Sequence, residues 1–259
     1  MKAQALTRLA SAGLRTVETR LVRSSELRLV PFEGRDLLYA RGVQTSGTKV
    51  SVTGSGETLA DQLSSHEDVE EWLVQPMIDF DWGGAAFSEG GLIHVEGVAG
   101  SPMSLLRLGE LALALTDAAG RHGYHAGSQR AIWDPVSEER RGLTMGVDTA
   151  SVVVNEVREL LARSRITGLV EWGSGFDGLY FLDHKSSHAT GALRAFLEEG
   201  PAPVEPTGRP CVRLETPDLI AMGDVDDRFD LLLQRGARLS HLVTYRCARA
   251  NRNIYFESW

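Results

Sequence analysis

Two short runs decide the fold: LVEW at residues 169–172 and LYFLD at residues 179–183. Both runs are rich in branched and aromatic residues, which favour strands. Residues 173–178 between them read GSGFDG, and glycine and aspartate are typical of turns. The pattern therefore predicts two antiparallel strands joined by a turn. Glu171 lies in the first strand and Asp183 in the second, so their carboxylates are expected to face one another across the pair.

The acid pair has two possible interpretations. Two hard oxygen ligands that converge on one point suit Mg²⁺, which would bridge the phosphates of a nucleotide. Strand alternation puts Lys185 on the same face as Asp183, where it would balance charge or contact a phosphate. The spacing alone is equally that of solvated acids at the ends of an ordinary hairpin, and it does not separate the two interpretations.

The hairpin resembles the end of the ATP-grasp domain found in phosphoenolpyruvate synthases, pyruvate phosphate dikinases and rifampin phosphotransferases. In that family the strand pair has the form D-I-E-W followed by L-Y-I-L-Q-x-R-P. The resemblance implies that Glu171 is a metal ligand. Asp183 stands where the family usually has glutamine on the metal side, and Lys185 stands where it has a phosphate-contacting arginine.

Further segments resemble the same family in the same order. VQPMI at 74–78 is similar to the V-Q-x-M-V strand that lines the adenine pocket, which implies nucleotide contacts for Gln75 and Met77. FDWGGAAFS at 80–88 resembles the segment that follows. IHVEGVAG at 93–100 resembles the strand and glycine loop beyond it, and Glu96 in that strand is predicted to bind the nucleotide. Each segment taken alone also fits a core strand with a tight turn.

VRSS at 22–25 resembles the family's V-R-S-S segment, so Arg23 is predicted to contact nucleotide phosphates. The forked guanidinium suits this role because it donates two parallel hydrogen bonds. A surface strand arginine is the other interpretation. The family has a longer lysine-bearing segment upstream, whereas 22 residues precede Arg23 here. We therefore expect a partner protein to supply the missing lobe, or the chemistry to be altered or lost.

GARLSHL at 236–242 resembles the phosphohistidine loop of the same families, which implies that His241 carries phosphate. Neutral imidazole is nucleophilic near pH 7, which suits such a relay. The other interpretation is a histidine at a helix N-terminus after a serine cap. His184 and His188 follow the hairpin and are expected within reach of the site, while His122 and His125 are predicted to lie in a polar loop.

The predicted fold class is α+β: an ATP-grasp-like mixed or antiparallel sheet with packed helices, followed by a small α/β segment. Residues 1–199 are predicted to form the nucleotide-binding domain, 200–208 a proline-rich linker, and 209–259 a phosphohistidine-domain-like segment. Periodicity and composition predict helices at 3–18, 58–63, 67–73, 105–119, 151–163 and 189–199, and further strands at 37–39, 49–52, 74–78, 85–88 and 92–95.

Bulk properties narrow the function classes. The chain has 259 residues and a net charge of −8, with no basic block of the kind that binds nucleic acid. No apolar run approaches the roughly 20 residues of a bilayer span, and the N-terminus resembles an amphipathic helix and not a signal peptide. Cys211 and Cys247 lack CxxC spacing, which favours free thiols in the cytoplasm, although a disulfide between them is compatible with the sequence.

The first hypothesis is an ATP- and Mg²⁺-dependent phosphotransferase, one component of a split enzyme. It would pass phosphate from ATP through His241 to a small-molecule acceptor that the sequence does not identify. A second hypothesis is an ATP-grasp carboxylate–amine ligase that works through an acyl phosphate, with His241 structural. A third is a degenerate, non-catalytic ATP-grasp-like subunit that binds a partner protein.

Overall fold

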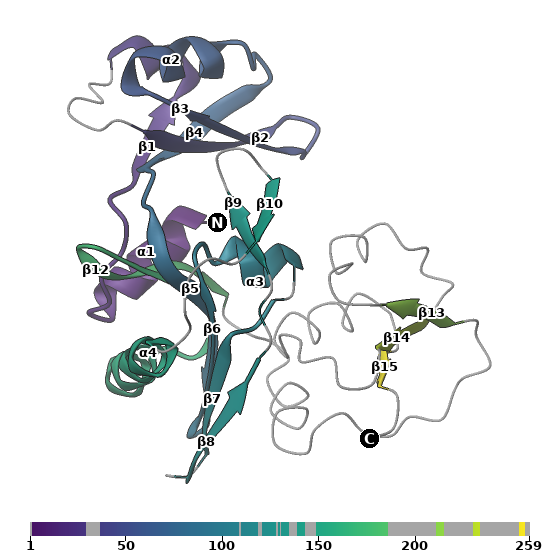
Figure 1. The fold of residues 1–259 in the computed structure, drawn as a ribbon. Coiled ribbons are helices and arrows are strands. Elements are labelled where there is room, and N and C mark those ends of the chain that lie inside the picture. Colours follow the sequence, from purple (N-terminus) through teal and green to yellow (C-terminus); the bar gives the residue numbers. More distant parts are fainter. Residues whose placement is uncertain are drawn as a thin grey trace.

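A computed structural model describes residues 2–29, 37–108, 110–118, 121–127, 129, 131–134, 139–142, 149–185, 211–214, 230–233 and 254–256. These residues form helices and mostly antiparallel strands, which confirms the predicted α+β class (Figure 1). The helices are α1 (Lys2–Ser11), η1 (a 3-10 helix, Ser24–Leu29), α2 (Gly56–Ser64), α3 (Met103–Leu108) and α4 (Ala150–Ser164).

The strands of the first lobe are β1 (Arg20–Arg23), β2 (Leu38–Gln44), β3 (Lys49–Gly54) and β4 (Val69–Pro76). The next group is β5 (Phe80–Glu89), β6 (Leu92–Ala99), β7 (Leu113–Ala118), β8 (Arg121–Ala126), β9 (Ala131–Asp134), β10 (Glu139–Gly142), β11 (Gly168–Gly175) and β12 (Gly178–Lys185). Three short strands follow: β13 (Cys211–Leu214), β14 (Asp230–Leu233) and β15 (Ile254–Phe256).

The main body is a six-stranded antiparallel sheet in the order β12-β11-β5-β6-β7-β8. Helix α4 packs on β5, β6 and β7, and α1 packs beside β12 (Figure 1). Their apolar side chains meet those of one sheet face in a single core. Its members include Leu6, Leu9, Trp82, Val95, Leu115, Val154, Val157, Leu161, Val170, Trp172 and Phe181. Burial of this face is the main force that holds the sheet and the two helices together.

Two glycines make room for the largest core side chain. Trp172 of β11 pairs with Gly84 of β5, which in turn pairs with Gly97 of β6. A Cβ atom at Gly84 would lie 2.8 Å from the Trp172 ring, and one at Gly97 would lie 3.5 Å from it. The indole therefore lies across two neighbouring strands where no side chains compete for the space.

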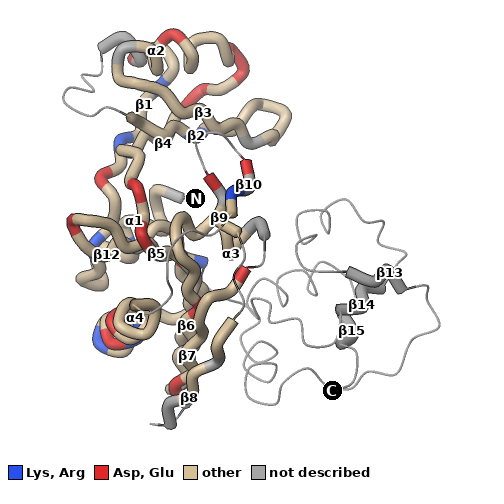
Figure 2. The backbone as a smooth tube through the Cα atoms, viewed as in Figure 1, with Lys and Arg blue, Asp and Glu red and all other residues tan. Residues whose placement is uncertain are grey.

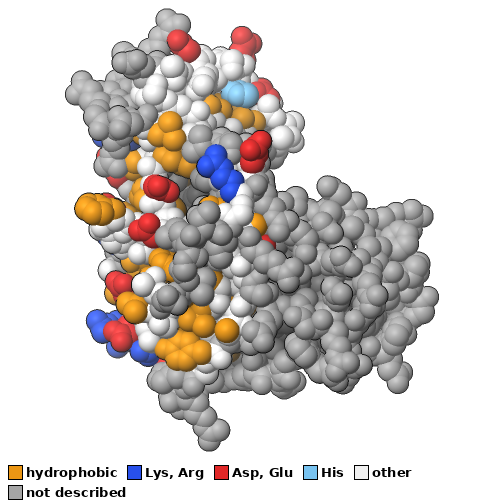
Figure 3. Space-filling view, in the orientation of Figure 1, with side chains coloured by type: hydrophobic (Ala, Val, Ile, Leu, Met, Phe, Trp, Pro, Cys, Tyr) orange, Lys and Arg blue, Asp and Glu red, His pale blue; other side chains and the backbone are white. Residues whose placement is uncertain are grey.

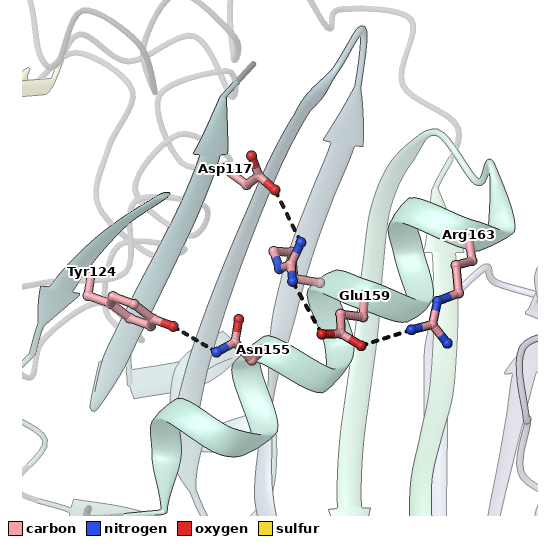
Figure 4. Close-up of polar contacts among 6 residues, drawn as sticks. Asp117, Tyr124, Asn155, Glu159 and Arg163 are labelled. Carbon is pink, nitrogen blue, oxygen red and sulfur yellow. Dashed lines mark hydrogen bonds and ion pairs between the residues drawn. The ribbon is translucent and has the colours of Figure 1, made fainter. Parts of the chain in front are cut away.

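Polar contacts tie α4 to the β7–β8 edge of the sheet (Figure 4). An Arg158 guanidinium nitrogen lies 3.3 Å from Oδ2 of Asp117, and the Asn155 amide donates to the Tyr124 hydroxyl at 2.7 Å. Arg163 and Glu159 form a surface ion pair one turn further on, at 2.9 Å. These contacts fix which way the helix faces, while the apolar core supplies most of the stabilisation.

Residues 20–76 build a second, smaller lobe. Its sheet has the order β1-β4-β2-β3, and α2 packs on β3. Val22, Ala40, Leu59, Leu63 and Trp72 belong to a separate core under this sheet. Met77, Ile78 and Asp79 join its central strand β4 to β5 of the large sheet. Acidic residues are spread over both lobes (Figure 2). Basic side chains appear only at separate places on the described part of the surface seen in Figure 3.

Several predicted elements are confirmed, and two predicted helices are wrong. The strands near 37–39 and 49–52, the helices near 58–63 and 151–163, and the 85–95 hairpin all form, although the first helix ends at Ser11. The predicted helix at 67–73 is instead the start of β4, because this segment is the central strand between β1 and β2. The predicted helix at 105–119 splits into α3 and β7, since residues 113–118 pair with β6. Tertiary pairing overrides the helix preference of both segments.

The remaining predictions concern the polar loop that contains His122 and His125, and the part of the chain after the hairpin. Residues 121–126, which contain His122 and His125, form the strand β8 and not a loop. Strands β13, β14 and β15 form a three-stranded parallel sheet, while the linker at 200–208 and the helix at 189–199 lie outside the described residues. The domain boundaries therefore stay a prediction. None of the described helices is long and apolar enough to cross a bilayer.

Candidate nucleotide and metal site

The predicted acid pair forms. Glu171 and Asp183 are directly opposite one another in the β11–β12 ladder. The same register continues across the sheet, where Glu171 pairs with Ala85 of β5 and Ala85 pairs with Glu96 of β6. Directly opposed residues point to the same face of an antiparallel sheet. Asp183, Glu171 and Glu96 therefore form one row on the face opposite α4.

A β-bulge in β12 makes this arrangement possible. Glu171 pairs with Asp183, but the next residue, Trp172, pairs with Phe181, so Leu182 is an extra residue in the ladder. Without the bulge, Phe181 and Asp183 would lie on the same face, because side chains alternate along a strand. The bulge directs Phe181 into the core, where it is fully buried, and leaves Asp183 beside Glu171.

The pair is accessible and has a cationic neighbour. Nζ of Lys185 lies 3.7 Å from Oε1 of Glu171, and the two side chains are 50% and 18% exposed. Oδ1 of Asp183 accepts a hydrogen bond from the backbone N–H of His184 at 2.8 Å. A half-exposed ion pair of this length contributes little to stability. The three charged groups are therefore free to take a ligand at small cost to the fold.

The donor set fits Mg²⁺ better than a metal held entirely by protein. Among the described residues there is no group of three or more His, Cys, Asp or Glu that could hold a metal ion. Mg²⁺ usually takes one or two carboxylates and completes its shell with waters and substrate phosphates. Glu171 and Asp183 provide those two carboxylates, and Lys185 lies where it can contact a phosphate.

Glu96 differs from the other two acids because it is fully buried. Its Oε1 is 3.1 Å from Nε2 of His94, and Nδ1 of His94 is 2.8 Å from the Thr116 hydroxyl. His94 and Glu96 are 2% and 0% exposed. Two strand spacings, or about 10 Å, separate the backbones of Glu96 and Glu171. The predicted nucleotide contact by Glu96 is thus on the same face as the acid pair but at a covered position.

Gln75 and Met77 lie at the link between the two lobes. The Gln75 amide donates to the Thr19 hydroxyl at 2.7 Å, and the Met77 N–H donates to the Leu37 carbonyl at 3.0 Å. The link leads into β5 at Phe80, five residues before Ala85 in the acid row, which is about 17 Å of strand. The two predicted parts of the site, one for a base and one for phosphates, therefore lie at different heights along β5.

Arg23 is not beside the other predicted residues. It pairs with Glu71 at the start of β4, and its side chain is exposed. Four residues of β4, or about 13 Å, separate Glu71 from Gln75. The small lobe carries one lysine, Lys49, whose partner in the ladder is Val43, at the end of β2 away from the link. Neither cation is brought to the link by the sheet register.

His184, one of the two histidines predicted near the hairpin, does not join the acid pair. His184 pairs with Val170, so it faces the side opposite Asp183, and its Nε2 lies 2.9 Å from the Thr167 carbonyl oxygen. The expectation that His184 reaches the site is therefore wrong, because the side chains of neighbouring strand residues alternate. His188 and His241 lie outside the described residues.

A polar cluster at the hairpin turn was not predicted from sequence. The Arg15 guanidinium lies 4.1 Å from the centre of the Tyr180 ring and donates to the Tyr180 hydroxyl at 2.6 Å and to Oδ2 of Asp177 at 3.3 Å. The Tyr180 hydroxyl donates to Asp177, and this bond, with the Arg15 charge, lowers the pKa of Asp177. Burial, with the same bond, raises the pKa of Tyr180. The cluster holds the N-terminal segment against β12.

No protein-family model matches the sequence, and a search of curated proteins finds no match. Solved structures give weak similarities. D-cycloserine synthetase DcsG is 13% identical with a TM-score of 0.34 over 71% of this chain. The ATP-grasp ligase PsnB with its minimal precursor is 15% identical (TM-score 0.36, 80% of the chain), and the RimK domain ATP-grasp protein of Sphaerobacter thermophilus is 14% identical (TM-score 0.37, 75% of the chain).

This chain spans 61%, 57% and 62% of those three proteins, respectively. TM-scores this low do not establish a shared fold. None of the three is described as a phosphoenolpyruvate synthase, pyruvate phosphate dikinase or rifampin phosphotransferase.

Proposed function

We propose that this chain is the nucleotide-binding part of an ATP- and Mg²⁺-dependent ligase of the ATP-grasp type, which activates a carboxylate as an acyl phosphate. The observation that supports it is the accessible pairing of Glu171 with Asp183, with the Lys185 ammonium 3.7 Å from Glu171, on the sheet face opposite α4. Two hard carboxylates beside one cation are suited to a magnesium nucleotide.

Each residue has a role in this proposal. Glu171 and Asp183 would hold Mg²⁺, which when bound neutralises phosphate charge and polarises phosphate oxygens. Lys185 would contact a phosphate oxygen as a compact point charge. Gln75 and Met77, at the link before β5, would contact the base. The link that carries Gln75 and Met77 and the acid pair lie at different positions along β5, which suits a ligand whose base and phosphates lie at opposite ends.

The ligase is proposed ahead of the phosphate relay because it needs the nucleotide and metal site alone, and no phosphate-carrying histidine such as His241. A ligase requires a bound nucleotide, a carboxylate and an amine, and the proteins named above include ligases by description. The acceptor is a small molecule or peptide whose identity the chain does not specify. A partner protein that supplies a lysine-bearing lobe, and cytoplasmic location, remain part of the proposal.

Nucleotide binding is the direct test. Isothermal titration of the full chain with MgADP should give saturable binding that E171Q and D183N each weaken at least about tenfold, or about 1.4 kcal/mol, because each removes one of the two charged ligands proposed for Mg²⁺. E159Q is the matched control, since Glu159 pairs with Arg163 on α4, away from the proposed site. Equal binding by all four proteins would contradict the assignment.

A second experiment separates the ligase from the relay and from a non-catalytic subunit. The chain is incubated with γ-labelled MgATP, alone and with candidate partner proteins. The ligase predicts label in free phosphate only when a carboxylate substrate is present, and no protein-bound label. Acid-labile label on the protein that H241A abolishes would favour the relay. Failure to bind MgADP with or without a partner would favour a non-catalytic role.

A further inference from the structure

The buried chain Thr116–His94–Glu96 is a feature that the proposed nucleotide site does not use. It connects two neighbouring strands, β6 and β7, with distances of 2.8 Å from Thr116 Oγ1 to His94 Nδ1 and 3.1 Å from His94 Nε2 to Glu96 Oε1. Burial increases along the chain: Thr116 is partly exposed, His94 is 2% exposed and Glu96 is fully buried. A hydroxyl at the accessible end, a base behind it and a buried acid is the arrangement of an activated nucleophile.

The tautomer of His94 follows from the state of Glu96. When the Glu96 carboxylate is ionised it only accepts hydrogen bonds, so Nε2 of His94 carries the hydrogen that bonds Glu96. In the neutral imidazole, Nδ1 is then the basic nitrogen, and it faces the Thr116 hydroxyl. The carboxylate thus holds His94 in the tautomer that can accept a proton from Thr116.

We propose that Thr116 is a nucleophile that takes an acyl group from an acyl phosphate. Oγ1 of Thr116 attacks the carbonyl carbon, its proton passes to Nδ1 of His94, and the C–O bond to phosphate breaks. The products are an acyl-threonine ester and inorganic phosphate, and no oxidant or reductant is needed. The inference rests on the proposed function for the source of the acyl phosphate.

The position of Thr116 agrees with this role. His94 and Glu96 are two residues apart on β6, so they share a face of the sheet with Glu171 and Asp183. Thr116 pairs with His94 and lies on that face as well. Strands β7 and β11 are three strand spacings apart, or about 14 Å. The ester would form on the same face of the sheet as the metal site, three strands away from it.

Acetyl phosphate is the probe, because it is a small acyl phosphate that requires neither ATP nor Mg²⁺. The full chain should gain one acetyl group by intact-mass spectrometry, and peptide mapping should place it on Thr116. Alkaline hydroxylamine should remove it, because it cleaves an oxygen ester whereas an acetylated lysine resists it. T116V should abolish the hydroxylamine-sensitive label, and T116S should keep it.

Two further variants test the roles of the other groups. H94Q keeps an amide that can reach Glu96 but removes the base, and labelling should slow by roughly 10²–10⁴-fold, the usual size of general-base catalysis. E96Q should slow it as well without removing the hydroxyl, while thermal melting verifies that both variants fold. Label that persists in T116V, a phosphoryl mass in place of an acetyl mass, or an unchanged rate in a folded H94Q would overturn the inference. MgADP binding is measured separately, so its failure affects only the proposed function.

Discussion

The two faces of the six-stranded sheet are built from the same strands and have opposite characters. One face carries Val95, Trp172 and Phe181 and is closed by α4 and α1. The other carries the row Asp183, Glu171 and Glu96. On the apolar face most contacts belong to the core, and polar contacts to α4 lie at the β7–β8 edge. On the polar face exposure rises from buried Glu96 on β6 to partly exposed Glu171 and exposed Lys185 at the hairpin.

The cause of this gradient is what covers the polar face. Helix α3 packs on β5 and β6, and a Cβ atom at Gly83 would lie 2.4 Å from the backbone nitrogen of Pro102. The segment leading into α3 therefore runs against β5 on this face. The polar face thus has two parts. The part at β5 and β6 is covered by α3 and suits fixed hydrogen bonds, and the part at β11 and β12 is open and suits a ligand.

The largest expected effect is on the apolar face. Trp172→Ala should lower the free energy of unfolding by about 3–5 kcal/mol, because it removes a fully buried indole that packs over Gly84 and Gly97. Urea unfolding followed by circular dichroism measures it. Phe176→Ala is the control, since Phe176 is fully exposed in the hairpin turn and should change stability by less than about 0.5 kcal/mol. A similar loss of unfolding free energy in both variants would contradict the assignment of Trp172 to the core.

Gly84→Ala should come next, with a loss of about 1–3 kcal/mol from overpacking. An added Cβ would lie 1.9 Å from the Glu96 carbonyl oxygen and 2.8 Å from the Trp172 ring. Gly123→Ala is the matched control on β8, where no heavy atom of the described residues lies within 4 Å of the added Cβ. The same unfolding measurement applies, and a Gly84→Ala protein as stable as Gly123→Ala would show that the glycine is not required by packing.

On the open polar face, Lys185→Ala should change stability by only about 0.2–1 kcal/mol, the range of exposed ion pairs. The same variant should weaken MgADP binding, because it removes the cation beside the acid pair. Thermal melting and calorimetric titration on one preparation measure both effects. A large stability loss without a change in binding would mean that this face serves the fold.

The smallest effect is expected at the hairpin turn and depends on pH. The pKa of Asp177 is lower in the folded protein than its ordinary value of 3.8, so its ionised form favours folding above that pH. This contribution should fade as pH falls through the folded pKa. The stability difference between the wild type and Asp177→Asn should therefore shrink in acid. Denaturant unfolding at neutral pH and below pH 3.8 tests it, and a difference that grows in acid would contradict the assignment.

The Tyr180 phenol gives the opposite dependence. Its pKa is raised above 10.0 in the folded protein, so the neutral form favours folding, and that contribution is lost as pH rises through the folded pKa. Tyr180→Phe should remove this alkaline dependence. The cluster of Arg15, Asp177 and Tyr180 should therefore stabilise the fold most at pH values above the pKa of Asp177 and below the pKa of Tyr180.

The parts of the site that lie close in sequence were predictable. Residues 169–183 contain both strands and their turn, so the hairpin and the alternation from Asp183 to Lys185 followed from period-two geometry. The predicted facing of Glu171 and Asp183 is confirmed, but it depends on the bulge at Leu182, because a regular register would pair Glu171 with Leu182. Arg23 and Gln75 come from different strands, and no local pattern indicates that about 13 Å of sheet lies between them. The Arg15–Asp177–Tyr180 cluster and the Thr116–His94–Glu96 chain likewise join segments whose spacing in sequence carries no signal.

The sequence by itself determined the hairpin, the helix at 150–164 and the α+β class, because each depends on local periodicity and turn chemistry. Only the tertiary structure decided that residues 69–73 and 113–118 are strands, since pairing with neighbours outweighed their helix preference. It also decided the bulge at Leu182, which places Phe181 in the core while Asp183 stays beside Glu171. Register and bulges depend on the partner strand, and so a single strand's sequence does not specify them.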